Sequence, residues 1–487
     1  MADIKQIQTG EQLDFRQRLA LTAKLSWPAM MAQLSSILMQ YIDTAMVGRL
    51  GADDSASIGL VSTSLWLFWG TCSAAMAGFS VQTAHRMGSG DYAAARRVLR
   101  QGLISAFLFG LAVAIIGVAI AVPLPGWLGG QPSIQHGATL YFFVFVAALP
   151  VLTLNYFGSA MLRAAGSMKV AGGLNVLMCV LDVIFNFFFI FDSNTYNIWG
   201  LELHFWGAGW GLMGAALGTV TSIVITAGLV LWYLTCREKD LAIWGRRCLD
   251  KASERVLRAF RPTRGILSNA LKVSAPMAME HAVLCGAQIA VTIVVAPLGV
   301  MAIAANAFAV TAESLCYMPG FGIGDAATTL VGQSYGAGRK DLARQFGMIT
   351  VGLGMTVMSL MGIVMYIFAP EMMEMLSPVS EIQQLGYESL RIEAWAEPMF
   401  AAAIVSYGVM VGVGDTMLPA CMNFGSIWLV RLPLAALLAP TMGLQGVWLA
   451  MCIELCFRGA IFLWRLFSGA WLKHGLKAPE SPTPTAL

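Results

Sequence analysis

The residues best suited to chemistry in this sequence are two aspartates that lie inside long apolar segments. Asp43 lies between Trp27 and Gly51, and Asp182 lies in a second such segment. An ionised side chain at the centre of a bilayer costs about 2.5 to 3.5 kcal/mol on insertion scales, so carboxylates at that depth usually face a protein interior or a water-filled cavity. We therefore interpret both as candidate binding groups for a proton or a cation.

Neutral polar residues accompany these aspartates in the first half of the chain. Asn175 and Asp182 are seven residues apart, nearly two helical turns, and therefore share one face of a helix. If that face meets Asp43, two carboxylates share a site of low dielectric, where desolvation and mutual repulsion favour the binding of a proton. Amide and hydroxyl oxygens also suit a hard cation such as Na⁺. We predict a cation-coupling site formed by Asp43, Asn175, Asp182 and Thr219, with Asp43 and Asp182 as the possible Na⁺ ligands and no resident metal.

Each of these residues also has a purely structural interpretation. Asn155, Asn186 and Thr219 serve equally well as hydrogen-bonding links between helices. Asp182 could instead lie near a membrane face, because Asp192 follows soon after it in the sequence.

The acids of the second half occupy other positions. Glu280 lies four residues after Pro276, and Glu313 lies in the next apolar segment. We predict that Glu280 and Glu313, together with Asn155, form a substrate site or a second coupling site, because carboxylates in a cavity attract cations. The alternative is that each acid pairs with a polar group across the helix bundle. Glu454 and Arg458, four residues apart, are better explained as an ion pair within one helix.

The composition of the chain identifies its class. Of 487 residues, 57% are hydrophobic and 12% are charged, whereas soluble proteins average about 25% charged residues. A membrane-spanning helix needs about 20 mostly apolar residues. Twelve stretches meet that description: 25–48, 58–84, 101–123, 138–161, 170–191, 208–236, 272–296, 301–331, 346–368, 392–413, 418–438 and 444–468. The net charge of +3 gives no reason to expect a nucleic-acid partner.

The distribution of basic residues predicts the orientation in the membrane. Lys and Arg are frequent in alternate connections, whereas 123–137, 192–206 and 439–443 contain neither. By the positive-inside rule, both termini and the connection near the middle of the chain face the cytoplasm. The polar N-terminus lacks a short apolar region with a cleavage site, so we expect no signal peptide.

The second half of the sequence repeats the first. Pro28 and Pro276 are 248 residues apart, and the same shift relates Pro150 to Pro398. The repeat predicts five regions: a cytoplasmic N-terminus (1–24), an N-lobe (25–236), a basic linker (237–271), a C-lobe (272–468) and a cytoplasmic tail (469–487). We therefore predict an all-α integral membrane protein with twelve transmembrane helices, arranged as two parallel-repeat six-helix lobes around a central cavity.

Several motifs, in order along the chain, resemble the multidrug and toxic compound extrusion (MATE) family. They are helix one with its proline, its aspartate and the following MVGRLG, the pair Leu181–Asp182, and the runs GLMGAALGT (Gly211–Thr219), ESLCYMPGFGIGDAATTLVGQSYGAG (Glu313–Gly338) and GVGDTMLP (Gly412–Pro419). The resemblance implies a secondary active antiporter that exports cationic or amphipathic compounds in exchange for H⁺ or Na⁺ by alternating access. It also implies a bacterial inner membrane.

Within the family, the DinF-like branch is associated with an acid on helix one that acts with polar residues of helices five and six. Asp43, Asp182 and Thr219 match that set. Many relatives carry an asparagine one turn before the helix-five aspartate, and Met178 takes that place here. A thioether is a poor ligand for Na⁺, so this difference favours protons.

Two other functions would make different demands on the sequence. A flippase for a lipid-linked or amphipathic metabolite shares the paired-lobe plan, and a strongly basic cavity would favour it. An enzyme would need a nucleophile with its base or a metal-binding motif, which the sequence does not contain. We expect a monomer in the lipid bilayer that binds organic cations or amphipathic compounds and needs no cofactor beyond its coupling ion.

Overall fold

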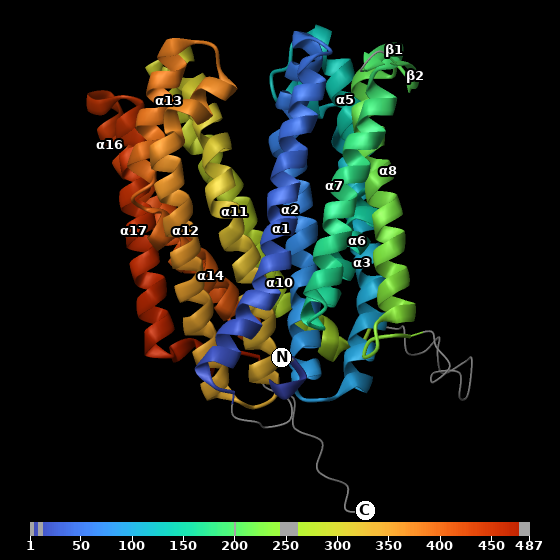
Figure 1. Cartoon of the computed structure of the whole chain (residues 1–487), viewed down its shortest axis with the longest axis vertical. Helices are drawn as coiled ribbons and strands as arrows, with labels where there is room; N and C mark the ends of the chain where they lie inside the picture. Colours follow the sequence, from blue (N-terminus) through green and yellow to red (C-terminus); the bar gives the residue numbers. More distant parts are fainter. Residues whose placement is uncertain (1–3, 8–12, 199–200, 244–261, 477–487) are drawn as a thin grey trace, which may run out of the picture.

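The computed structural model describes residues 4–7, 13–198, 201–243 and 262–476, and nearly all of them are helical. Figure 1 shows two helical lobes side by side, the first half of the chain in one and the second half in the other. The first lobe contains α1 (Phe15–Gly48), α2 (Ala52–Gly88), α3 (Tyr92–Ala121), α4 (Leu124–Trp127), α5 (Pro132–Ala147), α6 (Leu149–Ala164), α7 (Met168–Ile190) and α8 (Gly211–Trp232). The second contains α10 (Arg264–Val295), α11 (Val300–Gly336), α12 (Lys340–Leu376), α13 (Ser380–Glu393), α14 (Glu397–Val413), α15 (Met417–Ser426), α16 (Leu432–Met442) and α17 (Leu444–Ser468).

Short turns complete the helical part of the structure. Three are 3₁₀ turns: η1 (Ile4–Ile7), η3 (Ala296–Leu298) and η5 (Ala470–Lys473). Two are π-helical turns: η2 (Tyr233–Arg237), which follows α8, and η4 (Ile427–Arg431), which joins α15 to α16.

The described residues supply the twelve predicted membrane spans. Nine helical segments are long and apolar enough to cross a membrane, and two further spans are the bent pairs α5 with α6 (48°) and α13 with α14 (62°). The twelfth span is α1, which is long enough to cross a membrane at 34 residues. Its mean hydropathy is lower than that of the nine helical segments because it contains Ser35, Ser36, Gln40 and Asp43. A polar spanning helix must turn part of its surface toward other helices or a cavity.

The two bends occur at equivalent places in the repeat. Pro150 is the second residue of α6 and Pro398 the second residue of α14. Proline has no N–H to donate, so it fits a helix best in the first turn, where that N–H would have no partner within the helix. Each span therefore breaks just before its proline and restarts in a new direction, as the 248-residue shift between the two prolines leads one to expect.

The connection between α7 and α8 forms a β-hairpin that the sequence did not predict. Strands β1 (Asp192–Ile198) and β2 (Leu201–Ala208) pair antiparallel, with Asp192 opposite Ala208. They lie at the end of the molecule farthest from the labelled N-terminus (Figure 1). The first lobe has residues at this connection that the second lobe lacks, so the 248-residue shift no longer aligns the two halves after α7. The hairpin contains these extra residues.

The lobes join through α1 and α2 of the first lobe and α10 and α11 of the second: α1 packs on α11, and α2 packs on α10 and α11. Glycines allow the closest approach. A Cβ added to Gly88 would lie 1.9 Å from the carbonyl oxygen of Gln333, and one added to Gly336 would lie 2.1 Å from that of His85. Gly88 and Gly336 are themselves 248 residues apart, so the two contacts are equivalent under the repeat.

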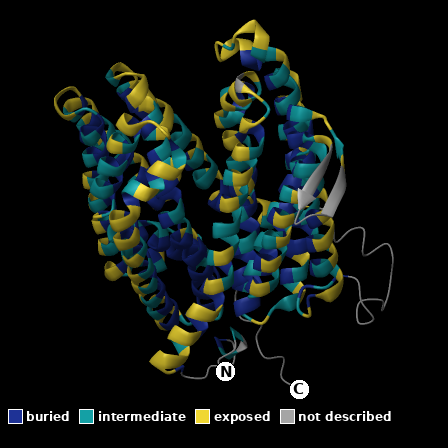
Figure 2. Ribbon diagram, turned by 45° about the horizontal axis from the view of Figure 1, so that its top comes forward, coloured by how far each residue is buried: buried dark blue, intermediate teal, exposed yellow. Residues whose placement is uncertain are grey.

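Two hydrogen bonds that are equivalent under the repeat join the lobes at the end of the molecule where the N-terminus lies. The His85 Nε2 lies 2.8 Å from the carbonyl oxygen of Gly412, and the Gln333 Nε2 donates to that of Ala164 over 2.7 Å. The 248-residue shift carries His85 onto Gln333 and Ala164 onto Gly412. The lobes therefore meet at the end where the N-terminus lies and diverge toward the opposite end (Figures 1 and 2).

Candidate functional site

A carboxylate cluster joins α1 to α7 in the first lobe. The Asn186 side-chain amide donates to Asp43 over 2.9 Å and to Asp182 over 3.0 Å. Asp43 lies five residues before the end of α1 and is partly exposed, whereas Asp182 is fully buried. The predicted encounter of Asp43 with the Asp182 face of helix five is present in the structure.

Helix α8 completes this cluster. The Ser222 hydroxyl, which donates to the Thr219 carbonyl over 2.8 Å, lies 3.5 Å from a carboxylate oxygen of Asp182. Thr219 and Asp43 are close enough to Asp182 to interact with it electrostatically. Two carboxyl groups hydrogen-bond to each other only when one of them carries a proton. The arrangement can therefore hold one proton between two acids, and release of that proton leaves two negative charges in contact.

The acceptor atom of the same asparagine is free. Asn186 Oδ1 is buried without a hydrogen-bond donor in the described part of the chain. Gly218 on α8 makes room for it, because a Cβ there would lie 2.1 Å from this oxygen. The cluster thus offers carboxylate, amide and hydroxyl oxygens together, the ligand types that a small hard cation requires.

The structure places Asn175 away from this cluster, for which it was predicted, and Asn155 away from Glu280, with which it was predicted to form a second site. The Asn175 amide donates to the Ala32 carbonyl over 2.9 Å and to the Ser36 hydroxyl over 3.0 Å, about two turns before Asp43 on α1. The Asn155 amide points at the Met178 sulfur over 3.7 Å. Both residues link helices within the lobe.

Asn186 and Ser222 belong to the cluster but were absent from the predicted coupling set. The sequence contained a signal for the first of them, because Asn186 follows Asp182 by four residues and shares its helix face. Ser222 follows Thr219 by three residues on α8 and had the same kind of signal.

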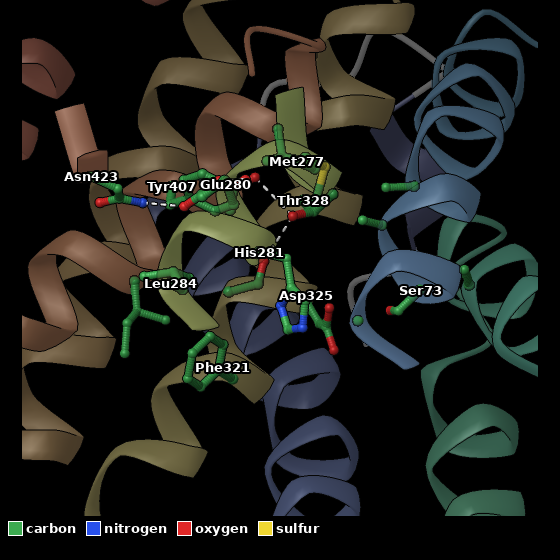
Figure 3. Close-up of a pocket in the computed structure, with 18 of the residues that line it drawn as sticks. Ser73, Met277, Glu280, His281, Leu284, Phe321, Asp325, Thr328, Tyr407 and Asn423 are labelled. Atoms are coloured by element: carbon green, nitrogen blue, oxygen red, sulfur yellow. Dashed lines mark hydrogen bonds between the residues drawn. The ribbon is translucent and has the colours of Figure 1, made fainter. Parts of the chain in front are cut away.

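A second site is the cavity between the lobes, which has a volume of about 560 Å³. Glu280 on α10 lines it and accepts hydrogen bonds from the Tyr407 hydroxyl and the Asn423 amide. Figure 3 shows both side chains directed at Glu280. Glu280 therefore lies at a cavity between the lobes, and its role in binding substrate or a coupling ion stays a prediction.

Aromatic, thioether and charged side chains share the walls of this cavity. Its walls include Tyr156, Met277, Leu284, Phe321 and Phe400. Its acidic residues are Glu280 and Asp325, and its basic residues are Arg163, Arg431 and Arg458. Arg163 faces Asp325 at 3.8 Å, and Arg458 pairs with Glu454 at 3.1 Å, so the Glu454–Arg458 ion pair predicted from the sequence is present.

Glu313, the other predicted acid of the second lobe, lies apart from the cavity. It is buried on α11, and the charged groups that act on it are Arg431 and Arg458. Glu393 and Glu397, where α13 ends and α14 begins, are buried nearby without hydrogen-bond partners in the described residues. The structure thus separates Glu280, which contacts the cavity, from Glu313, which belongs to the interior of the lobe.

Comparison with known proteins places the chain in a family. The MatE family model matches residues 28–188 and 276–437, and the two matched segments begin 248 residues apart, the same shift as the internal repeat. Together they cover about two thirds of the sequence.

Curated relatives and solved structures agree with that match. The chain is 28% identical over 438 residues to a probable multidrug resistance protein NorM of Pseudomonas aeruginosa, covering 87% of this chain and 84% of that protein. It is 25% identical over 461 residues to the probable NorM of Thermotoga maritima, covering 94% of each.

Among solved structures, one of MATE in the straight conformation superposes with a TM-score of 0.85 at 20% identity, covering 97% of this chain and 99% of that one. An outward-facing multidrug resistance MATE transporter of the MOP superfamily superposes with a TM-score of 0.83 at 21% identity, covering 96% and 98%. The chain is therefore a multi-pass membrane transporter, not an enzyme, and belongs to the MatE family.

Proposed function

We propose that this protein exports cationic or amphipathic toxic compounds, multidrug substrates among them, in exchange for protons. The observation that carries the proposal is that Asn186 donates hydrogen bonds to both Asp43 on α1 and Asp182 on α7 and so holds the two acids in one site. It is supported by the NorM-named relatives, which are designated multidrug resistance proteins.

The geometry suggests how a proton could change the shape of the first lobe. A proton shared by Asp43 and Asp182 allows α1 and α7 to pack closely, and its loss sets two negative charges against each other, which repel strongly in a low dielectric. Because α1 also packs on α11 of the other lobe, movement of α1 changes the contact between the lobes. A ligand shifts such an equilibrium only by its differential affinity for the two states.

The proposal also covers the coupling ion, the regions of the chain, the membrane and the oligomeric state. Met178 supports protons rather than Na⁺ as the coupling ion. Its side chain contacts Asn155 and supplies no oxygen to the site formed by Asp43 and Asp182. The predicted division into an N-lobe, a linker and a C-lobe is part of this proposal, as is the location of both termini in the cytoplasm of a bacterial inner membrane. Most of the linker (237–271) and of the tail (469–487) lies outside the described residues. The protein works as a monomer, and in the described state the cavity opens outward.

The experiment that tests the proposal is transport of a fluorescent organic cation in proteoliposomes under an imposed pH gradient and, separately, a Na⁺ gradient. We expect pH-driven transport that Asp43→Asn and Asp182→Asn abolish, because neither variant can cycle the shared proton. Asp53→Asn is the matched control: Asp53 is exposed in the first turn of α2 and should have no effect.

Three outcomes would contradict the proposal. Full pH-driven transport by Asp43→Asn would remove the helix-one acid from coupling. Transport driven only by Na⁺ would replace the proton as the coupling ion. Transport driven by Na⁺ that survives Asp43→Asn would move coupling to Glu280 or Glu313.

The flippase remains the second candidate, and the arginines of the cavity are the observation that bears on it. A strongly basic cavity would favour phosphate-bearing lipids. However, Arg163 and Arg458 each have a carboxylate partner, so the cavity is of mixed charge and favours the exporter.

A further inference from the structure

We propose that the segment 469–476, which follows α17, is a plug that seals one side of the junction between the lobes and stabilises the state that is closed at the end of the molecule near the N-terminus, the terminal end. The plug is a conformational device, so it depends neither on the coupling ion nor on the cargo of the proposed export function. It follows from a difference between two contacts that the repeat makes equivalent.

On one side of the junction, a row of polar side chains on α11 joins the lobes. Asp325, Thr329 and Gln333 follow one another at intervals of four residues and therefore share one face of the helix. Asp325 forms its ion pair with Arg163 of α6 at 3.8 Å. The Thr329 hydroxyl donates to the Arg163 carbonyl over 3.2 Å, and the Gln333 amide donates to the Ala164 carbonyl over 2.7 Å. Three polar contacts thus hold the end of α6 to α11.

The equivalent side, between α2 and α14, lacks such a row. The 248-residue shift places the α11 row on Ala77, Val81 and His85 of α2, and the end of α6 on Val411 and Gly412 of α14. His85 keeps its contact with the Gly412 carbonyl. The other two positions of the row carry apolar side chains, which cannot form a hydrogen bond or an ion pair. This side of the junction therefore has one polar contact where the other side has three.

The chain after α17 is anchored to the second lobe beside this apolar side. It turns along the end of the molecule where the N-terminus lies (Figure 1) and forms η5. The Trp471 indole in η5 is buried and donates to the Leu466 carbonyl of α17 over 3.1 Å. Trp471 therefore fixes the start of the segment and directs the residues after it toward α14.

Leu476 covers the apolar side itself. Its side chain packs against a cluster of three buried valines, Val81 of α2, Val273 of α10 and Val411 of α14. Its N–H donates to the Val413 carbonyl of α14 over 2.9 Å. Separation of α2 from α14 breaks up this cluster and exposes Leu476 to water, which is unfavourable in proportion to the apolar area. The segment therefore stabilises the closed state.

Glycines make the seat of the plug. Gly414 has a φ of +87°, and a Cβ there would lie 2.7 Å from the Leu476 side chain. A Cβ on Gly475 would lie 2.7 Å from the Val413 carbonyl oxygen and 2.9 Å from the Tyr335 hydroxyl. The Tyr335 ring in turn lies 5.2 Å from the ring of His85. The segment thus fits closely beside the polar contact of this side of the junction.

The test measures opening on each side separately, by the distance between two spin labels in liposomes, in a background without the native cysteines. Labels at Ser89, where α2 ends, and Met417, where α15 begins, span the side that the plug seals. Labels at Lys169 in the first turn of α7 and Lys340 in the first turn of α12 span the side of the polar row.

Four variants are compared with the wild type. Leu476→Ser removes the apolar contact, and a chain that ends at His474 removes the plug while keeping Trp471. Leu476→Met keeps an apolar side chain of similar volume. Lys473→Gln is the matched control, because Lys473 lies in the same segment and is exposed.

For Leu476→Ser we expect the ratio of open to closed molecules, read from the Ser89–Met417 distances, to rise about fivefold, the effect of exposing part of a leucine side chain. The shortened chain should open at least as much. Leu476→Met and Lys473→Gln should resemble the wild type. The Lys169–Lys340 distances should change less in every variant, because the α11 row remains.

Three results would overturn the inference. Unchanged Ser89–Met417 distances in both Leu476→Ser and the shortened chain would show that the segment seals nothing. Equal widening on both sides would indicate a general loss of packing in the second lobe. Opening by Leu476→Met as large as that by Leu476→Ser would show that apolar burial is not the cause. Failure of the export proposal is distinguishable from all three, because these distances are measured without cargo or gradient.

Discussion

At the scale of single residues, one asparagine decides which acids work together. Asn186 has a single side-chain NH₂ group, and its two donors reach Asp43 and Asp182. It therefore holds an acid of α1 and an acid of α7 in one site, and no other residue in the described part of the chain hydrogen-bonds to both. Asn175, which also links α7 to α1, contacts a carbonyl and a hydroxyl instead.

This difference predicts distinct effects for the two asparagines. Asn186→Ala should lower pH-driven transport by about tenfold or more, because it removes both hydrogen bonds from the acid pair and a buried hydrogen bond to a charged group contributes about 1.5 to 3 kcal/mol. Asn175→Ala should retain most transport and lower thermal stability by a few degrees. Initial transport rates and unfolding temperatures of the two variants check this, and equal transport by both would contradict the assignment.

At the scale of the elements, glycines and prolines determine how the helices meet. Gly88 and Gly336 lie where α2 and α11 cross, each against a backbone carbonyl of the other helix. Small residues let helices in a membrane approach closely, and packing is the main force between such helices. Pro150 and Pro398 end the preceding helices at equivalent positions and so give each lobe one bent span.

The glycine contact gives a second prediction. Gly88→Val should force the lobes apart at the closed end, because a Cβ there would lie 1.9 Å from the Gln333 carbonyl. We expect a lower unfolding temperature in detergent and slower transport of every cargo. Gly90→Ala is the informative neighbour: Gly90 has open space around it but a φ of +74°, so this change should strain only the turn and leave the lobe contact intact. Normal stability of Gly88→Val would show that this contact does not hold the lobes together.

At the scale of the whole molecule, two equivalent hydrogen bonds hold the lobes together at the end near the termini. His85 reaches the Gly412 carbonyl on α14, and Gln333 reaches the Ala164 carbonyl on α6. The export cycle that we propose requires this end to open, as in other transporters built from two repeated lobes. Both bonds must therefore break in each transport cycle, together with the glycine contacts beside them.

If each of these two hydrogen bonds holds the lobes together, removing both should open the end near the termini more than removing either one. His85→Leu and Gln333→Leu should each shift the population toward the state open at the terminal end, and the double variant should shift it further. Distances between spin labels at Ser89 and Lys340, in a background without the native cysteines, report the opening. Thr356→Ala, an exposed position on α12 whose hydroxyl bonds only to the Gly352 carbonyl of the same helix, should leave the distances unchanged. An unaltered distance distribution in the double variant would show that the bonds do not hold the closed end.

The sequence by itself determined the membrane class, the twelve spans and the two lobes. These features depend on local composition and on a repeat of 248 residues that is visible by comparing the chain with itself. It also identified Asp43 and Asp182 as candidate coupling residues, because carboxylates inside apolar segments are rare. It did not predict the bends before Pro150 and Pro398, the close approach of α2 to α11, or the β-hairpin.

Only the tertiary structure decided which polar groups meet. Whether Asn186 or Asn175 joins the acid pair depends on the rotation of α7 against α1, whose residues are 143 positions apart in the chain. The separation of Glu280 from Glu313, and the exposure of Arg431 to the cavity after a π-helical turn, likewise follow from helix packing and backbone geometry. Apolar periodicity leaves these rotations open, because a polar residue in a membrane helix can face either a neighbouring helix or a cavity.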